Sequence, residues 1–119
     1  MDRQTLGRRG EAAAAKYYLD RGWTLLDHNY RTRQGELDLV LRRDDVLVIA
    51  EVKTRTSQDY GLPCEAVGPA KQRRLILAAG SYLAEKGLGE LTVRFDVVEV
   101  LRGEKSCQIH CIPGAFECE

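Results

Sequence analysis

The residues most able to do chemistry in this sequence are two acids and a lysine, Asp38 and the short run Glu51-Val52-Lys53. Two carboxylates and an amine on one strand face make up a set that cleaves phosphodiester bonds. The acids would hold Mg²⁺ or Mn²⁺ against a phosphate oxygen, and the ion would polarise the phosphorus centre and lower the pKa of its bound water. The lysine would orient the attacking water or offset charge that grows in the transition state.

A β-hairpin is predicted to position these residues. The runs 36–42 and 46–53 are rich in Val, Ile and Leu, and Asp44 and Asp45 between them favour a turn. With a two-residue turn, residue i would face residue 89 − i across the hairpin. A slip of one residue would send the acids to opposite faces, so the interpretation depends on this register.

The predicted register brings four charged side chains to one face of the hairpin. Asp38 would lie opposite Glu51, and Glu36 would lie opposite Lys53. Like charges directly opposed on a sheet are destabilising, and buried charge is costly unless it is paired or binds a metal. Mg²⁺ takes one or two carboxylates together with water and phosphate, so we interpret the cluster as a metal site. The alternative is a solvated ladder in which Glu36 pairs with Lys53 and Asp38 reaches an arginine.

An N-terminal helix is predicted over 3–21, ended by Gly22 and followed by a strand over 23–30. Its inward stripe is expected to consist of Ala13, Ala14, Tyr17 and Tyr18. Glu11 borders this apolar side of the helix. Two interpretations of Glu11 stay open, a first-turn acid favoured by the helix dipole and a functional acid beside the site.

A second helix is predicted over 69–86, with Pro69 at its first position and Gly87 after its end. The stripe that would cover the sheet consists of Leu75, Ala78, Ala79, Tyr82 and Leu83. Lys71 and Gln72 extend this stripe toward the end of the sheet that carries Lys53. A plain surface position for Lys71 is the alternative.

The last strands follow this helix. The segment 91–101 is expected to pair in parallel with 46–53, because a crossover helix joins them. Residues 107–112 would add an edge strand that Pro113-Gly114 ends. The resulting order is α-β-β-β-α-β with one additional edge strand, which indicates an α/β fold.

Length and composition fit a single domain over residues 1–119, with a core at about 3–101 and an edge strand and tail over 102–119. The 18 basic and 18 acidic residues balance, so net charge indicates no particular partner. No apolar run reaches membrane-spanning length, and the N-terminus lacks a secretory apolar region. We therefore expect a cytoplasmic protein without a membrane partner.

Cysteines offer a second possible metal site. Cys107, His110, Cys111 and Cys118 have the residue types for zinc. On a strand, however, Cys107 and Cys111 point one way and His110 the other, whereas zinc ligands must converge tetrahedrally. Free thiols in a reducing compartment are therefore favoured.

Arginines near the predicted strand ends are candidates for phosphate contacts. Arg55 enters the stretch 54–68, which is long enough to be either disordered or a binding loop. The full set is Arg8, Arg9, Arg31, Arg33, Arg42, Arg43, Arg55, Arg73 and Arg74. The alternative is scattered arginine that keeps a neutral protein soluble.

Several motifs together resemble the YraN family, small bacterial proteins of restriction-endonuclease-like, PD-(D/E)xK type that are similar to archaeal Holliday-junction resolvases. The resemblance covers residues 7 to about 100. It rests on Gly7-x-x-Gly10-Glu11, Asn29-Tyr30-Arg31, Gly35-Glu36-Leu37-Asp38-Leu39, Glu51-Val52-Lys53-x-Arg55, Ala66-Val67 with Lys71, and Arg94-Phe95-Asp96. Leu37 stands where the wider nuclease family has the proline of its motif, which leaves the ligand set intact.

The resemblance implies a restriction-endonuclease-like αβββαβ core with a mixed central sheet flanked by helices. It implies Mg²⁺ or Mn²⁺ at Asp38 and Glu51, a catalytic lysine at Lys53 and a supporting acid at Glu11. The candidates for nucleic-acid contacts are Arg31, Arg33, Arg55, Lys71 and Gln72. A homodimer is expected by analogy, because junction resolvases need two sites to cut two strands.

Two functions remain open at the level of sequence. The first is a metal-dependent DNA endonuclease that acts on branched or otherwise unusual DNA. The second is a catalytically weak nucleic-acid-binding or protein-interaction module that retains the fold. All four candidate groups, Glu11, Asp38, Glu51 and Lys53, are present, which favours the first.

Overall fold

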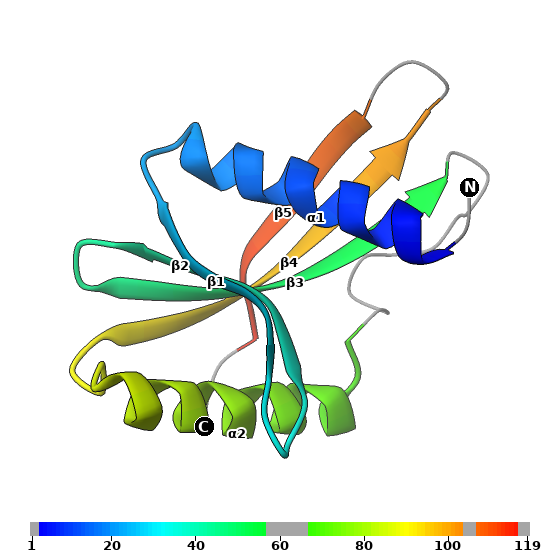
Figure 1. Cartoon of the computed structure of the whole chain (residues 1–119). Helices are drawn as coiled ribbons and strands as arrows, with labels where there is room; N and C mark the ends of the chain where they lie inside the picture. The colour runs from blue at the N-terminus through cyan, green and yellow to red at the C-terminus, as the bar shows by residue number, and fades with distance from the viewer. Residues whose placement is uncertain (1–2, 57–66, 104–106, 117–119) are drawn as a thin grey trace.

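The computed structural model describes residues 3–56, 67–103 and 107–116, and two helices cover opposite faces of one five-stranded sheet (Figure 1). The elements in chain order are α1 (Arg3–Leu19), β1 (Thr24–Arg31), β2 (Glu36–Arg43), β3 (Val46–Thr56), α2 (Pro69–Lys86), β4 (Thr92–Arg102) and β5 (Cys107–Phe116). No helix within the described ranges is long and apolar enough to cross a membrane. The order confirms the predicted mixed α/β architecture, including the additional edge strand.

The sheet has the order β1-β2-β3-β4-β5, so β3 is its central strand. β1, β2 and β3 pair antiparallel, β3 and β4 pair in parallel, and β5 returns antiparallel to β4. Parallel pairing of β3 with β4 requires the chain to cross over one face of the sheet, and α2 makes that crossover. The predicted hairpin register is confirmed, because Leu39 pairs with Ala50 and Arg43 pairs with Val46.

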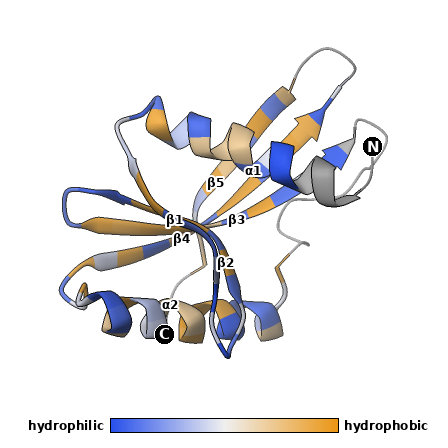
Figure 2. Ribbon diagram, in the orientation of Figure 1, coloured by the Kyte–Doolittle hydropathy of each residue, from blue (hydrophilic) through white to orange (hydrophobic). Residues whose placement is uncertain are grey.

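Each helix buries its apolar stripe against one face of the sheet, and Figure 2 shows hydrophobic residues concentrated along the strands between the two helices. On the α1 face, Ala14, Ala15 and Tyr18 pack on Leu41, Val48 and other strand residues. On the α2 face, Leu75, Ala78, Ala79 and Tyr82 pack on Ile49, Phe95 and their neighbours. Both predicted stripes are therefore confirmed in their main members.

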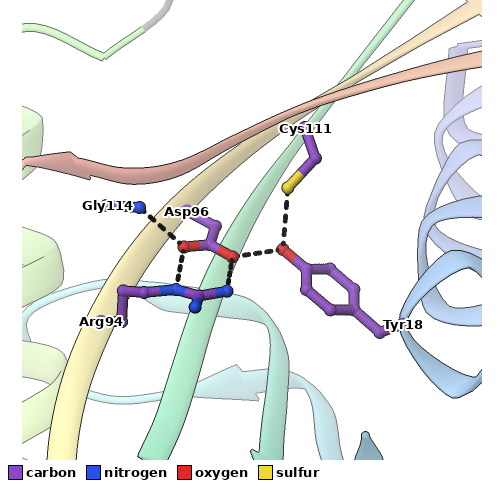
Figure 3. A network of polar contacts seen from close by, with 5 residues as sticks. All are labelled: Tyr18, Arg94, Asp96, Cys111 and Gly114. Carbon is purple, nitrogen blue, oxygen red and sulfur yellow. Dashed lines mark hydrogen bonds and ion pairs between the residues drawn. The ribbon is translucent and has the colours of Figure 1, made fainter. Parts of the chain in front are cut away.

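Asp96 of β4 anchors α1 to the edge of the sheet that β5 forms (Figure 3). Its buried carboxylate accepts hydrogen bonds from the Tyr18 hydroxyl at 2.7 Å, from Arg94 Nε and Nη2 at 2.9 Å each, and from the Gly114 amide at 3.0 Å. Cys111 Sγ lies 3.6 Å from the same hydroxyl. A buried carboxylate is stable when its oxygens are this fully satisfied, so Asp96 acts as a structural link between α1, β4 and β5.

Helix α2 begins and ends at the signals that the sequence carries. Gly68 caps it in an extended conformation, Pro69 occupies its first turn, and Gly87 ends it with a left-handed φ of 67°. The side chain of Ser81 donates to Gln34 Oε1 at 3.2 Å, so the tip of the β1–β2 hairpin lies against this helix.

Several predicted boundaries were wrong. α1 ends at Leu19 rather than at residue 21, because the chain turns tightly before Trp23. β3 continues to Thr56 rather than ending at residue 53, since β4 supplies parallel partners as far as Arg102. The rest of the predicted loop, 57–66, lies outside the described residues.

The predicted end of β5 at Pro113-Gly114 was also wrong, because the strand continues to Phe116. Pairing shifts between Val97–Ile112 and Phe95–Phe116, so the extra residues form an irregularity opposite Asp96. Proline is tolerated on an edge strand at such a bulge. Gly114 adopts a φ of 61° there and turns its amide toward Asp96.

Gly10 marks the closest approach of α1 to the sheet, because a Cβ at this position would overlap Thr54 Oγ1 of β3. We expect Gly10→Ala to destabilise the protein by about 1–3 kcal/mol, the usual cost of overpacking. The matched control is Gly80→Ala on α2, where a Cβ meets nothing within 4 Å. That change should stabilise the protein by up to about 1 kcal/mol, since alanine favours helix. Urea unfolding measures both, and equal effects of the two substitutions would contradict the proposed contact.

Candidate functional site

The β2–β3 ladder ends just where the two candidate acids begin. Leu39–Ala50 is the last backbone pair of this ladder. Beyond it, the side chain of Asp38 links the two strands by accepting a 2.9 Å hydrogen bond from the Val52 amide. Asp38 and Glu51 thus come from adjacent strands at one end of the hairpin. The register places them together as predicted, but a side-chain bond replaces the expected backbone pairing.

Glu51 is a carboxylate on the central strand with only 4% of its surface exposed. Lys53 Nζ, on the same strand face, lies 3.5 Å from Glu51 Oε1. Lys71 Nζ donates to the same oxygen from the first turns of α2. Lys71 therefore takes the position beside the acids that its place in the helical stripe predicted, and not the plain surface position.

Asp38 carries an unusual protonation equilibrium. Burial raises the pKa of its carboxyl to about 7, and the charge of Glu51 contributes further in the same direction. The Val52 hydrogen bond and the positive charge of Lys71 act in the opposite sense, whereas the charge of Glu11 adds to the increase. A carboxylate beside a second carboxylate in a partly buried site favours the neutral form.

The two lysines differ in their protonation. Burial lowers the pKa of Lys53 below the usual range of lysine, and contact with Lys71 lowers it further. Burial alone would lower the pKa of Lys71 too. The contact between Lys71 and Glu51 outweighs the effect of burial and raises the pKa of Lys71. Lys71 is therefore the stable counter-charge of Glu51, and Lys53 is the amine that gives up its proton more readily.

Glu11 lies on the edge of α1 that faces the acids. Its Oε1 accepts a 3.2 Å hydrogen bond from Asn29 Nδ2. Burial raises the pKa of Glu11, the Asn29 hydrogen bond opposes this, and the charges of Glu36 and Glu51 contribute further increases. Because α1 begins at Arg3 and has no acid in its first turn, the first-turn interpretation of Glu11 was wrong.

Glu11, Asp38 and Glu51 do not form a three-acid metal site among the described residues. Within the described ranges, no group of three His, Cys, Asp or Glu side chains is gathered closely enough to hold a metal ion. Glu11 is instead bonded to Asn29. Asp38 and Glu51 are the two carboxylates that the backbone itself brings to one place.

The strands do not form the alternative ladder, in which Glu36 would pair with Lys53 and Asp38 would reach an arginine. Lys53 pairs with Glu51, and Glu36 pairs instead with Arg31 of β1, with Arg31 Nε 3.4 Å from Glu36 Oε2. Neither Asp38 nor Glu51 pairs with an arginine in the described part of the chain. The two acids are thus not each neutralised by a guanidinium.

The remaining predicted nucleic-acid contacts divide into two kinds. Arg31 and Arg33 are exposed near the tip of the β1–β2 hairpin. Gln72 donates from Nε2 to the Val67 carbonyl at 3.0 Å and so supports the start of α2.

Cys107 and Cys111 are free thiols, while Cys64 and Cys118 lie outside the described residues.

Glu99 is a charged residue of this region that the sequence did not single out. It is 6% exposed and pairs with Lys53 in the parallel ladder, so the two residues are neighbours on adjacent strands. Arg55 Nε lies 3.8 Å from its Oε2, which has no hydrogen-bond partner among the described residues. The available signal was a lone acid inside the apolar run 97–101. Arg55, predicted to contact DNA, is partly engaged by this acid.

The raised pKa of Asp38 predicts a specific pH dependence of stability. A carboxyl with a higher pKa in the folded protein than in the unfolded chain binds its proton more tightly when folded. The unfolding free energy should therefore fall as pH rises from about 4, the unfolded value, to about 7. One group contributes a slope of at most about 1.4 kcal/mol per pH unit.

Asp38→Asn should remove this contribution, and urea unfolding without divalent ions at a series of pH values measures the difference from wild type. The control Asp20→Asn changes an exposed carboxylate that pairs with Lys16 and leaves Asp38 in place. It should retain the wild-type slope. A difference between wild type and Asp38→Asn that stays constant from pH 4 to 8 would contradict the proposed burial of charge.

Comparison with known proteins places this chain in a family. Residues 10–100 match the family described as "Uncharacterised protein family UPF0102". A UPF0102 protein of Anaeromyxobacter dehalogenans is 48% identical over 115 residues, which cover 97% of this chain and 86% of the relative. A UPF0102 protein of Syntrophotalea carbinolica is 47% identical over 117 residues, covering 98% of this chain and 95% of the relative. The chain therefore belongs to the UPF0102 family, which is the YraN family that its motifs indicated.

Proposed function

We propose that this protein is a divalent-metal-dependent DNA endonuclease of the PD-(D/E)xK type that acts on branched or otherwise structured DNA. The observation that carries the proposal is the meeting of Asp38 and Glu51 at the end of a β-hairpin, with Lys53 beside them. Two acids that can hold a metal, with an amine beside them, are groups that can catalyse phosphodiester hydrolysis. The mixed sheet with a helix on each face agrees with the core that such nucleases share.

The residues present fit Mg²⁺ or Mn²⁺. Both acids supply hard oxygen donors, and Mg²⁺ needs only one or two carboxylates because water and substrate phosphate complete its shell. The site already holds a cation, since the Lys71 ammonium contacts Glu51. A bound ion would polarise the phosphate and lower the pKa of a water molecule.

The chain's own residues have distinct roles in this proposal. Asp38 and Glu51 bind the metal, and the Val52 amide fixes the orientation of Asp38. Lys53, with its lowered pKa, orients the attacking water and can accept its proton. Lys71 offsets negative charge near the phosphate, and Glu11 supports the site from α1.

DNA is the proposed substrate because the acids and the lysine suit a phosphodiester, and cationic side chains lie on the strands and the turn that lead to them. Arg31 and Arg33 are exposed on the hairpin tip, and Arg55 continues the strand that carries the acid and the lysine. Phosphate contacts of this kind position a nucleic acid without reading its sequence. A homodimer, in which two such sites cut two strands, remains a prediction.

One observation favours a second function, a nucleic-acid-binding module with little catalysis. Lys53 and Lys71 both contact Glu51, so its charge is compensated without a metal. A metal would have to compete with these amines for the same oxygen. Binding of DNA without cleavage in either metal would support this alternative.

Cleavage of structured DNA tests the proposal directly. We expect nicking of junction, flap or single-stranded substrates in Mg²⁺ or Mn²⁺, and about a 10²- to 10³-fold or larger loss of rate in Asp38→Asn and in Lys53→Ala. Asp20→Asn should cleave like wild type, because Asp20 lies at the far end of α1 and pairs with Lys16. Wild-type protein that binds these substrates but cuts none of them would refute the nuclease proposal.

Metal binding has a readout that does not require activity. At an ion concentration ten times Kd, binding to the folded state alone adds about 1.4 kcal/mol to the unfolding free energy. Thermal unfolding at pH 8 should show this in wild type and not in the Asp38→Asn/Glu51→Gln double variant. The effect should weaken at pH 5, because Asp38 has a pKa of about 7 and is then protonated. Equal stabilisation of both proteins would exclude these acids as ligands.

A further inference from the structure

A cavity of about 380 Å³ opens between α1 and the β1–β2 hairpin. Its apolar walls consist of Ala12, Ala15, Leu25 and Leu39, and its polar residues are Arg8, Glu11, His28 and Asn29. Small-molecule sites in proteins have this volume and this combination of apolar walls with a few polar groups. The cavity therefore has the size and chemistry of a ligand site.

This cavity adjoins the proposed catalytic site. Leu39, which lines it, belongs to the last backbone pair of the β2–β3 ladder and follows Asp38 in the chain. Glu11 belongs to both, because it lines the cavity while its charge contributes to the raised pKa of Asp38. A group bound here would lie beside Glu11, the residue that links the cavity to Asp38.

The backbone of β1 is distorted at the rim of the cavity. Asn29 adopts a φ of 50°, in the left-handed region that non-glycine residues rarely occupy. Its Nδ2 donates to Glu11 Oε1 at 3.2 Å and lies 3.4 Å from His28 Nδ1. Such strain persists only where the surrounding structure imposes it, and it is concentrated at binding and catalytic sites. The distortion holds two polar rim residues, His28 and Asn29, at the mouth of the cavity.

We propose that this cavity binds the base of an unpaired nucleotide next to the phosphate that is cut. A base has flat apolar faces, which suit Ala12, Ala15 and Leu39, and an edge of donors and acceptors, which suits Asn29 and Glu11. Arg8 is a cation at the rim that can contact the backbone phosphate or stack on the base. These features match a base more closely than other ligand classes.

Two other ligand classes fit less well. A free phosphate would meet the Glu11 carboxylate and an apolar wall, and both disfavour an anion. An alkyl chain would offer no partner to the donors and acceptors of Asn29 and Glu11 that remain free beside the hydrogen bond joining them. The mixed wall and rim require a ligand with both an apolar face and a polar edge.

The inference rests on the proposed nuclease function and narrows its substrate. A base within a duplex cannot enter a pocket in a protein unless its nucleotide is extruded. The substrate would therefore be a strand with an unpaired nucleotide beside the scissile phosphate, as in a flap, a gap or an open branch point, rather than a continuous duplex.

Filling the cavity tests this proposal without any cleavage. Ala12 is exposed on α1 and lines the cavity, so Ala12→Trp should block it without disturbing the core. The matched control is Ala84→Trp, on an exposed position of α2. In EDTA, fluorescence anisotropy with a short labelled single strand should give about tenfold weaker binding for Ala12→Trp and wild-type binding for the control.

An abasic strand provides the second arm. If the base enters the cavity, a strand that carries only abasic sites should bind wild type and Ala12→Trp equally, because neither complex contains the contact. Asn29→Gly relieves the positive φ and removes the amide, so it should keep the fold while it weakens binding of the strand with bases. Thermal unfolding checks that each variant is folded.

The outcomes separate this inference from the nuclease proposal. Wild-type affinity for the strand with bases in both Ala12→Trp and Asn29→Gly would overturn the base pocket, even if the wild type cleaves DNA. Equal loss of affinity for strands with and without bases would also overturn it, because the effect would then act on the backbone. Absence of cleavage by the wild-type protein would refute the nuclease proposal. The binding experiments with and without bases would still decide whether the cavity binds a base.

Discussion

A carboxylate buried on the central strand of a sheet needs a positive partner, and Glu51 imposes that requirement on the rest of this fold. It is 4% exposed, and the amines that compensate it come from its own strand and from α2. Isolated charge in such a place is too costly to persist. The docking of the first turns of α2 on the sheet therefore also supplies Glu51 with its counter-charge, Lys71.

The structure treats two of its buried carboxylates, Asp96 and Glu51, in different ways. Asp96 is held by four hydrogen bonds from groups with fixed geometry, including a bidentate arginine and a backbone amide. Glu51 is held by two lysines, whose long side chains rearrange easily. Asp96 is suited to permanent structure (Figure 3), whereas the proposed function would require the two lysines to release Glu51 to a metal and to contact the phosphate instead.

The sequence predicted the elements and the meeting of the acids because these depend on local signals. Apolar periodicity gave both helices, the Asp44-Asp45 turn gave the hairpin register, and the stripe on α2 led to Lys71. Contacts that depend on tertiary structure were not predictable. The Val52 bond of Asp38, the positive φ of Asn29 and the passage of β5 through Pro113 have no local signature. Glu99 was missed because one acid in an apolar strand usually signals an edge or a turn.

The hydrogen bond between Tyr18 and Asp96 joins residues 78 positions apart. Contacts of such long sequence separation form late, because the loop between them must close first. During synthesis α1 emerges well before β4 exists, so the Tyr18 hydroxyl has no Asp96 partner until residue 96 has been made. The strands that its apolar face covers, β2 and β3, are complete much earlier. A partly synthesised chain can therefore place α1 against the strands that carry the acids before the bond that fixes this helix to β4 exists.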